Sequence, residues 1–112
     1  MRKMGIFAVL AASTVAMAQQ PAGDARRGAT LFMHDGCYAC HGTVGHGAPY
    51  GPKLAPHAIP WEAFQQQVRH PRGSMPHYEP RFTSDQDLAD IYAYVASIPE
   101  GRPANRIPLL KD

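Results

Sequence analysis

Three residues in one short segment, Cys37, Cys40 and His41, have the types and the spacing that covalent haem attachment requires. The cysteines lie one helical turn apart, so both sulfurs project to the same side and can add to the two vinyl groups of one haem. His41 follows directly, and its imidazole is then placed to bind the iron as the proximal ligand. This C-x-x-C-H segment therefore predicts one haem c per chain, held through Cys37 and Cys40.

Three other interpretations of the segment stay open on its residues alone. A structural zinc site needs four ligands, and the other histidines of this chain stand singly. A thioredoxin-like thiol pair is expected beside a βαβ pattern, and the sequence has no strand pattern. A short motif also arises by chance. Haem attachment is the hypothesis that the rest of the chain favours.

Two helices are predicted on either side of this motif. Residues 25–33 follow Asp24, a favourable N-cap, and Gly36 is a suitable stop after them. Residues 61–68 begin after a proline and carry apolar side chains at helical spacing, namely Trp61, Phe64 and Val68. The motif itself therefore comes directly after the end of the first helix.

A third helix is predicted over residues 85–98. Ser84 is placed to cap it, acidic residues fill its first turn, and Pro99 ends it. Its aspartates, Asp85, Asp87 and Asp90, indicate a solvated face.

Long irregular segments separate these helices. The stretch 42–60 and the stretch around Pro71 to Pro80 are rich in glycine or proline, and 101–112 form a tail with no evident structure. Loops of this length are unusual in a small domain unless they enclose something functional. They agree with a large bound cofactor.

In the order of its motifs the chain resembles the class I cytochromes c, over residues 28–94. The resemblance rests on four features: Gly28 with Phe32, the haem motif, Gly51-Pro52-Lys53-Leu54, and Met75-Pro76 ahead of a helix carrying Tyr94. It implies an all-α fold in which N- and C-terminal helices cross, a short middle helix is added, and loops enclose one haem. It also implies that Gly28 and Phe32 meet Tyr94 at the crossing.

The resemblance also supplies a partner for the proximal histidine. In the family, the proline carbonyl of a Gly-Pro-x-Leu stretch accepts the second ring N–H of the ligating histidine, and Pro52 matches that proline. Such a contact fixes the orientation of a metal-binding imidazole. Lys53 stands where the family often has asparagine.

Two methionines follow the first 18 residues and are candidates for the sixth iron ligand. Met33 lies on the helix that leads into the motif and cannot easily reach the opposite face of a haem. Met75 lies 34 residues after His41, in the loop expected to cross that face, and Pro76 biases it toward an extended backbone. The resemblance implies Met75 as the distal ligand.

Two histidines compete with this assignment. His70 and His77 flank Met75 closely, so ligation by two histidines is an alternative, and an open sixth position is another. Methionine ligation raises the reduction potential and leaves no free axial position, which favours electron transfer over catalysis.

The first 18 residues are predicted to be a cleavable signal peptide. Arg2 and Lys3 precede an apolar stretch of 13 residues, 6–18, which ends in the small-x-small pattern of a cleavage site after Ala18. That stretch is shorter than the ~20 residues that span a bilayer. The expected mature domain, 19–112, has nine basic and nine acidic residues, so its charge gives no support for nucleic-acid binding.

Taken together, the sequence predicts a soluble periplasmic electron-transfer protein with no membrane span in its mature form. No nucleophile–histidine–acid set and no phosphate-binding glycine loop is present, so we expect no enzyme activity. The expected redox partners are a dehydrogenase, a quinol-oxidising complex or a terminal oxidase. The alternative is a haem-c subunit of a multi-subunit dehydrogenase or oxidase.

Overall fold

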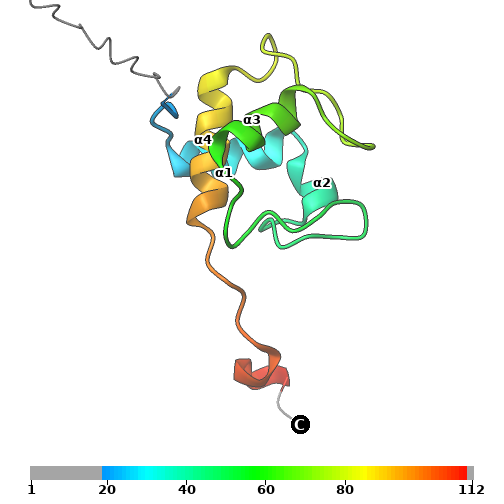
Figure 1. Cartoon of the computed structure of the whole chain (residues 1–112). Coiled ribbons are helices and arrows are strands. Elements are labelled where there is room, and N and C mark those ends of the chain that lie inside the picture. The colour runs from blue at the N-terminus through cyan, green and yellow to red at the C-terminus, as the bar shows by residue number, and fades with distance from the viewer. Residues whose placement is uncertain (1–18, 111–112) are drawn as a thin grey trace, which may run out of the picture.

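The computed structural model describes residues 19–110, whose arrangement is shown in Figure 1. Its elements are α1 (Ala25–His34), α2 (Cys37–His41), α3 (Trp61–Arg69), α4 (Asp85–Ser97) and two 3₁₀ turns, η1 (Ala104–Arg106) and η2 (Pro108–Leu110). Within residues 19–110 the only β-type pairing is one isolated bridge, between Ala48 and Gly51. The predicted all-α fold is confirmed, and α2 is a helix of its own directly after α1.

No helix in the part of the chain that the structure describes is long and apolar enough to cross a bilayer. The predicted signal peptide, residues 1–18, lies outside the described residues.

The ends of α1 follow from its flanking residues. The Asp24 side chain accepts hydrogen bonds from the backbone N–H groups of Arg26 and Arg27, which the first turn of a helix leaves without partners. Gly36 lies just beyond the last turn with φ at 80°, a left-handed conformation that favours glycine. Because the chain turns sharply at Gly36, α2 and its cysteines begin immediately after α1.

Helices α1 and α4 cross where Gly28 meets the α4 backbone. A Cβ atom at position 28 would lie 1.8 Å from the carbonyl oxygen of Asp90, so only glycine permits this approach. Next to it, the rings of Phe32 and Tyr94 pack edge to face with their centroids 5.4 Å apart. The predicted meeting of Gly28, Phe32 and Tyr94 is confirmed.

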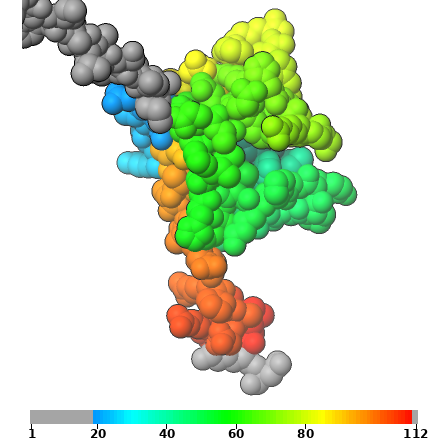
Figure 2. Space-filling view, in the orientation of Figure 1, coloured from blue at the N-terminus to red at the C-terminus, as the bar shows by residue number. Residues whose placement is uncertain are grey.

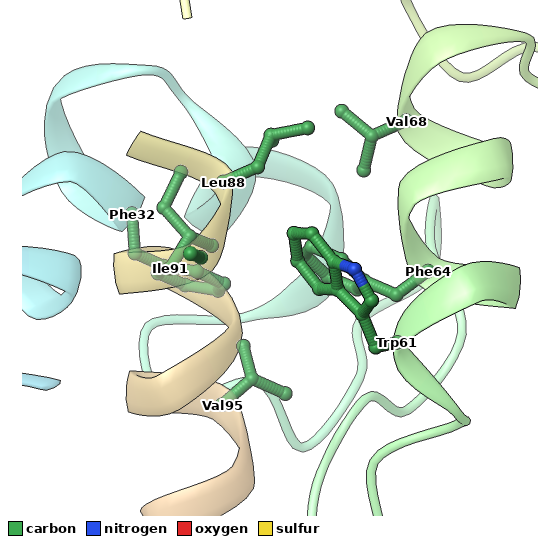
Figure 3. Packing of buried hydrophobic residues seen from close by; sticks show 8 residues of the cluster. Phe32, Trp61, Phe64, Val68, Leu88, Ile91 and Val95 are labelled. Carbon is green, nitrogen blue, oxygen red and sulfur yellow. The ribbon is translucent and has the colours of Figure 1, made fainter. Parts of the chain in front are cut away.

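The hydrophobic core lies between this crossing and α3. Figure 3 shows Trp61, Phe64 and Val68 of α3 pointing toward the α4 side chains, with Phe32 of α1 behind them. Tyr92 of α4 packs edge to face on both Trp61 and Phe64. The apolar stripes of the three helices thus form one cluster.

Asp90 does not lie on a solvated face, as the sequence predicted for the α4 aspartates. It is 2% exposed and accepts hydrogen bonds from the Asp24 N–H at 2.8 Å and from Gln86, and it pairs with the Arg27 guanidinium. Burial alone raises the pKa of the Asp90 carboxyl, but these hydrogen bonds hold it below its usual value. A buried carboxylate is tolerated here because α1 and the residue before it supply the partners.

Asp90→Asn is expected to lower the free energy of unfolding by about 2–3 kcal/mol at pH 7, because an amide has only one acceptor oxygen for the three donors from Asp24, Gln86 and Arg27 and buries an NH₂ group among them. A carboxyl whose pKa is lowered by folding stabilises the fold above its unfolded value, near 3.9, and loses this effect as the pH falls through the folded value. The difference between wild type and variant should therefore shrink below about pH 4. Denaturant unfolding at several pH values measures it, with Glu62→Gln, an exposed carboxylate of α3, as the control. An equal loss at pH 3 and pH 7 would contradict the charge argument.

The C-terminal tail also differs from the prediction, which gave it no structure. It leaves the body after α4 and ends in η1 and η2, as the orange and red segments of Figures 1 and 2 show. The His46 ring contacts the carbonyl oxygen of Pro99 at 3.0 Å, which fastens the start of the tail to the loop behind the haem motif. Backbone bonds within single turns, such as Arg106 N–H to Pro103, hold η1 and η2.

Candidate functional site

Helix α2 brings the two cysteines of the motif together. Gly36 precedes the helix, Gly42 with φ at 82° ends it, and Cys37 and Cys40 lie one turn apart on it. Both side chains are free thiols and half-buried. Cys37 packs against the hydrophobic cluster.

The surroundings of Cys37 disfavour a charged sulfur. Burial and the nearby Asp35 carboxylate raise the pKa of the Cys37 thiol to about 11. Metal sites of the zinc type need thiolates, whereas a thioether is uncharged. The apolar packing around Cys37 agrees with the uncharged thioether that haem attachment produces.

His41 is held by the carbonyl group that the sequence indicated. Its Nδ1 lies 2.8 Å from the carbonyl oxygen of Pro52, and the side chain is buried. A carbonyl can only accept, so Nδ1 must carry the proton and donate it to Pro52. The lone pair is then on Nε2, which has no hydrogen-bond partner among the described residues. A ring in this state presents the nitrogen that a metal ligand needs.

The loop after α2 brings Pro52 against the histidine by a close backbone approach. A Cβ at Gly51 would lie 2.6 Å from the Cys40 carbonyl oxygen and 3.0 Å from His41 Nδ1. The Gly47 N–H donates to the His41 carbonyl at 2.9 Å and fixes the return of the loop. The Gly-Pro sequence thus has a steric reason, since any larger residue at position 51 displaces Pro52 from His41.

Met75 lies in the loop between α3 and α4 and packs against the same hydrophobic cluster as Cys37. Gln67 of α3 positions it: its Nε2 lies 3.7 Å from Met75 Sδ and 3.3 Å from the Arg72 carbonyl oxygen. Its Oε1 accepts from the Arg72 N–H at 3.4 Å. One amide side chain therefore holds both the start of the loop and the sulfur, a role that the sequence analysis did not identify.

The far end of the Met75 loop is fastened by a buried arginine. Arg69 donates to the carbonyl oxygens of Tyr78 and Thr83, at 2.9 and 2.7 Å, and pairs with Asp85 at 2.7 Å. Charge-assisted bonds of this kind are strong. They fix where the loop returns to α4.

A third set of bonds joins this loop to the haem motif. The Tyr78 hydroxyl donates to the Asp35 carbonyl oxygen at 2.8 Å, and the Thr83 hydroxyl donates to the Asp35 carboxylate at 2.9 Å. Asp35 lies two residues before Cys37. The segments that carry His41 and Met75 are therefore connected, and Figures 1 and 2 show their loops projecting on the same side of the molecule.

The competing histidines lie differently from Met75. His70 and His77 are both exposed, and their rings face each other with centroids 6.4 Å apart. Met75 is the half-buried member of the three. This arrangement favours Met75 as the inward-facing donor.

The zinc interpretation was tested on the geometry of possible ligands. Across residues 19–110, no three His, Cys, Asp or Glu side chains gather closely enough to hold a metal ion. The donor set is instead two cysteine sulfurs on one turn, an imidazole with a free Nε2, and a thioether in a fixed loop. These residues fit a haem bound through two thioethers and two axial ligands.

An all-α chain with crossed terminal helices, a C-x-x-C-H turn and a methionine loop defines the class of the c-type cytochrome domains. The chain belongs to the family described as cytochrome c oxidase, cbb3-type, subunit III, whose sequence model matches residues 23–95. The match begins just before α1 and ends within α4, so it covers the domain and leaves out the tail. None of the curated proteins matches the chain. Membership in this family implies covalently bound haem c and electron transfer.

Proposed function

We propose that this chain is an exported electron-transfer protein that holds one haem c covalently through Cys37 and Cys40. His41 and Met75 are its axial iron ligands. The proposal rests above all on the contact of His41 Nδ1 with the Pro52 carbonyl oxygen at 2.8 Å. This contact leaves the lone pair on Nε2 of a buried imidazole that directly follows the two cysteines in the chain. When bound, the haem supplies a reversible one-electron exchange between Fe(III) and Fe(II).

The protein's own residues set the conditions for that exchange. Pro52 keeps the His41 ring in one tautomer and one orientation, and Cys37 and Met75 are half-buried against the hydrophobic cluster. Gln67, Arg69 and Tyr78 hold the Met75 loop in place. A fixed ligand set on both sides requires little rearrangement when charge changes, which suits electron transfer.

The same arrangement argues against catalysis at the iron. With His41 and Met75 both bound, no axial position is left for oxygen, peroxide or another substrate. The protein is therefore a carrier or relay of electrons and not an enzyme.

The partners are redox proteins, and two settings are proposed. In the first, the chain is a soluble periplasmic carrier between a dehydrogenase or quinol-oxidising complex and a terminal oxidase. In the second, it is a permanent haem-c subunit of such a complex, which the family description as an oxidase subunit favours. Purification of the native protein as a lone chain supports the first setting, and co-purification with oxidase or dehydrogenase subunits supports the second.

The proposed function is tested by a redox titration of the haem-loaded protein. We expect one reversible one-electron step, and a ferrous form that does not bind carbon monoxide near neutral pH. Rapid carbon monoxide binding by the wild type would contradict the closed ligand set and point to an open-site haem protein.

Gln67→Leu is expected to loosen Met75 without removing it. The variant loses the contact of Nε2 with Met75 Sδ and both bonds to Arg72. If these contacts together stabilise the closed loop by about 1.4 kcal/mol, the loop opens about tenfold faster without them. The measurement is the rate at which added imidazole displaces Met75 from the ferric protein. Gln66→Leu, an exposed neighbour on α3, is the matched control. Equal rates in the two variants would remove Gln67 from this role.

A further inference from the structure

His70 and His77 are two chemically competent side chains that the proposed haem site does not use. His70 directly follows α3, and His77 lies two residues beyond Met75. Both are exposed, with ring centroids 6.4 Å apart and ring planes inclined by 21°. Two imidazoles seven positions apart in a loop come this close only because the backbone is folded back on itself.

The fold holds the two histidines in this relation. The Tyr78 N–H donates to the Val68 carbonyl oxygen at 3.3 Å, so the segments that enter and leave the loop run side by side at its base. The Gln67–Arg72 bonds and the His70 N–H bond to the Gln66 carbonyl fix the entering side. The pair is therefore set by backbone contacts and not by a chance meeting of flexible side chains.

We propose that His70 and His77 form a binding site for one divalent transition-metal ion of the zinc or copper type. Imidazole nitrogen is a preferred donor for these ions, with bonds of roughly 2.0–2.1 Å, so one ion fits between two rings at this separation after small side-chain rotations. Both residues are exposed, so their rings have solvent on one side into which they can rotate. No carboxylate or third histidine joins the pair among residues 19–110, and water completes the coordination.

An ion at this site closes the loop that contains Met75. It joins position 70, just after α3, to position 77. A ligand that binds only the closed arrangement stabilises that arrangement by RT ln(1 + L/Kd), where L is the free concentration of the ion. The effect of the ion on Met75 as an iron ligand rests on the proposed function. Binding of the ion to His70 and His77 does not. The site thus links an external metal ion to the rigidity of the methionine loop.

The test is isothermal titration of ferric, haem-loaded protein with Zn²⁺, which has no redox chemistry and meets no free thiols once Cys37 and Cys40 carry the haem. We expect one Zn²⁺ per chain, no binding of Mg²⁺, and an affinity at least tenfold lower in His70→Ala and in His77→Ala. His57→Asn is the matched control: His57 is exposed with φ at 67°, and asparagine tolerates that backbone. Thermal unfolding checks that all variants are folded.

A second measurement follows the loop itself. Zn²⁺ should slow amide hydrogen exchange at residues 72–75 and 77 several-fold in the wild type and leave it unchanged in His70→Ala. A smaller than tenfold change in affinity in either alanine variant, or an equal loss in His57→Asn, overturns the site. If Met75 proves not to be the iron ligand while Zn²⁺ binding still depends on both histidines, the metal site stands and only the ligand assignment fails.

Discussion

Ferrous Met75→Ala is expected to bind carbon monoxide rapidly, and its reduction potential should fall by roughly 0.1–0.2 V within the ~0.8 V range that axial ligands control. The variant removes the half-buried thioether of the loop between α3 and α4, so the sixth position opens or takes water. Absorption spectra with and without carbon monoxide, together with a potentiometric titration, measure both effects.

His77→Ala is the matched control for this experiment. Its side chain is exposed and faces His70, so its removal should leave the potential and the closed ligand set unchanged. The reverse result, with carbon monoxide binding in His77→Ala and not in Met75→Ala, would show that histidine is the distal ligand. An effect in neither variant would mean that neither Met75 nor His77 is the distal ligand.

Gly28→Ala is expected to have the largest effect on folding, a loss of about 3 kcal/mol in the free energy of unfolding. Alanine gains up to about 1 kcal/mol in helix propensity, but its Cβ would lie 1.8 Å from a backbone oxygen of α4, which cannot rotate away. The two helices must separate, and the Phe32–Tyr94 contact opens with them. Denaturant unfolding of the haem-loaded protein measures the loss.

Thr30→Ala, an exposed position on the same helix, controls for the general effect of alanine in α1. It should change stability by no more than about 0.5 kcal/mol. If Gly28→Ala proved as stable as Thr30→Ala, the close crossing of α1 and α4 would be wrong.

Local signals in the sequence predicted most of the fold. Asp24 and Ser84 cap their helices as expected, because capping depends only on side chains one to three residues away. Gly28 and Phe32 with Tyr94 were found through resemblance, and so was the contact of Pro52 with His41. These features occur in a fixed order along the chain, so they can be recognised from the sequence alone.

Contacts between distant segments were not predictable in the same way. Asp90 looks like a surface residue in the pattern of α4, and its burial is favourable only because Arg27 of α1 and Asp24, just before α1, lie beside it. Asp35 and Tyr78 are 43 residues apart, and no periodicity signals their bond. The contact of Gln67 with Met75 depends on the path of an irregular loop, and no sequence pattern predicts that path.

The central claim, that Cys37 and Cys40 hold one haem covalently, is tested most directly by the mass of the denatured protein made in cells with a working haem-attachment system. We predict a mass equal to the polypeptide plus one haem, with a pyridine haemochrome spectrum of the c type. Replacement of both cysteines by serine should release the haem on denaturation. A wild-type chain that shows the bare polypeptide mass and two reactive thiols would contradict covalent attachment of haem.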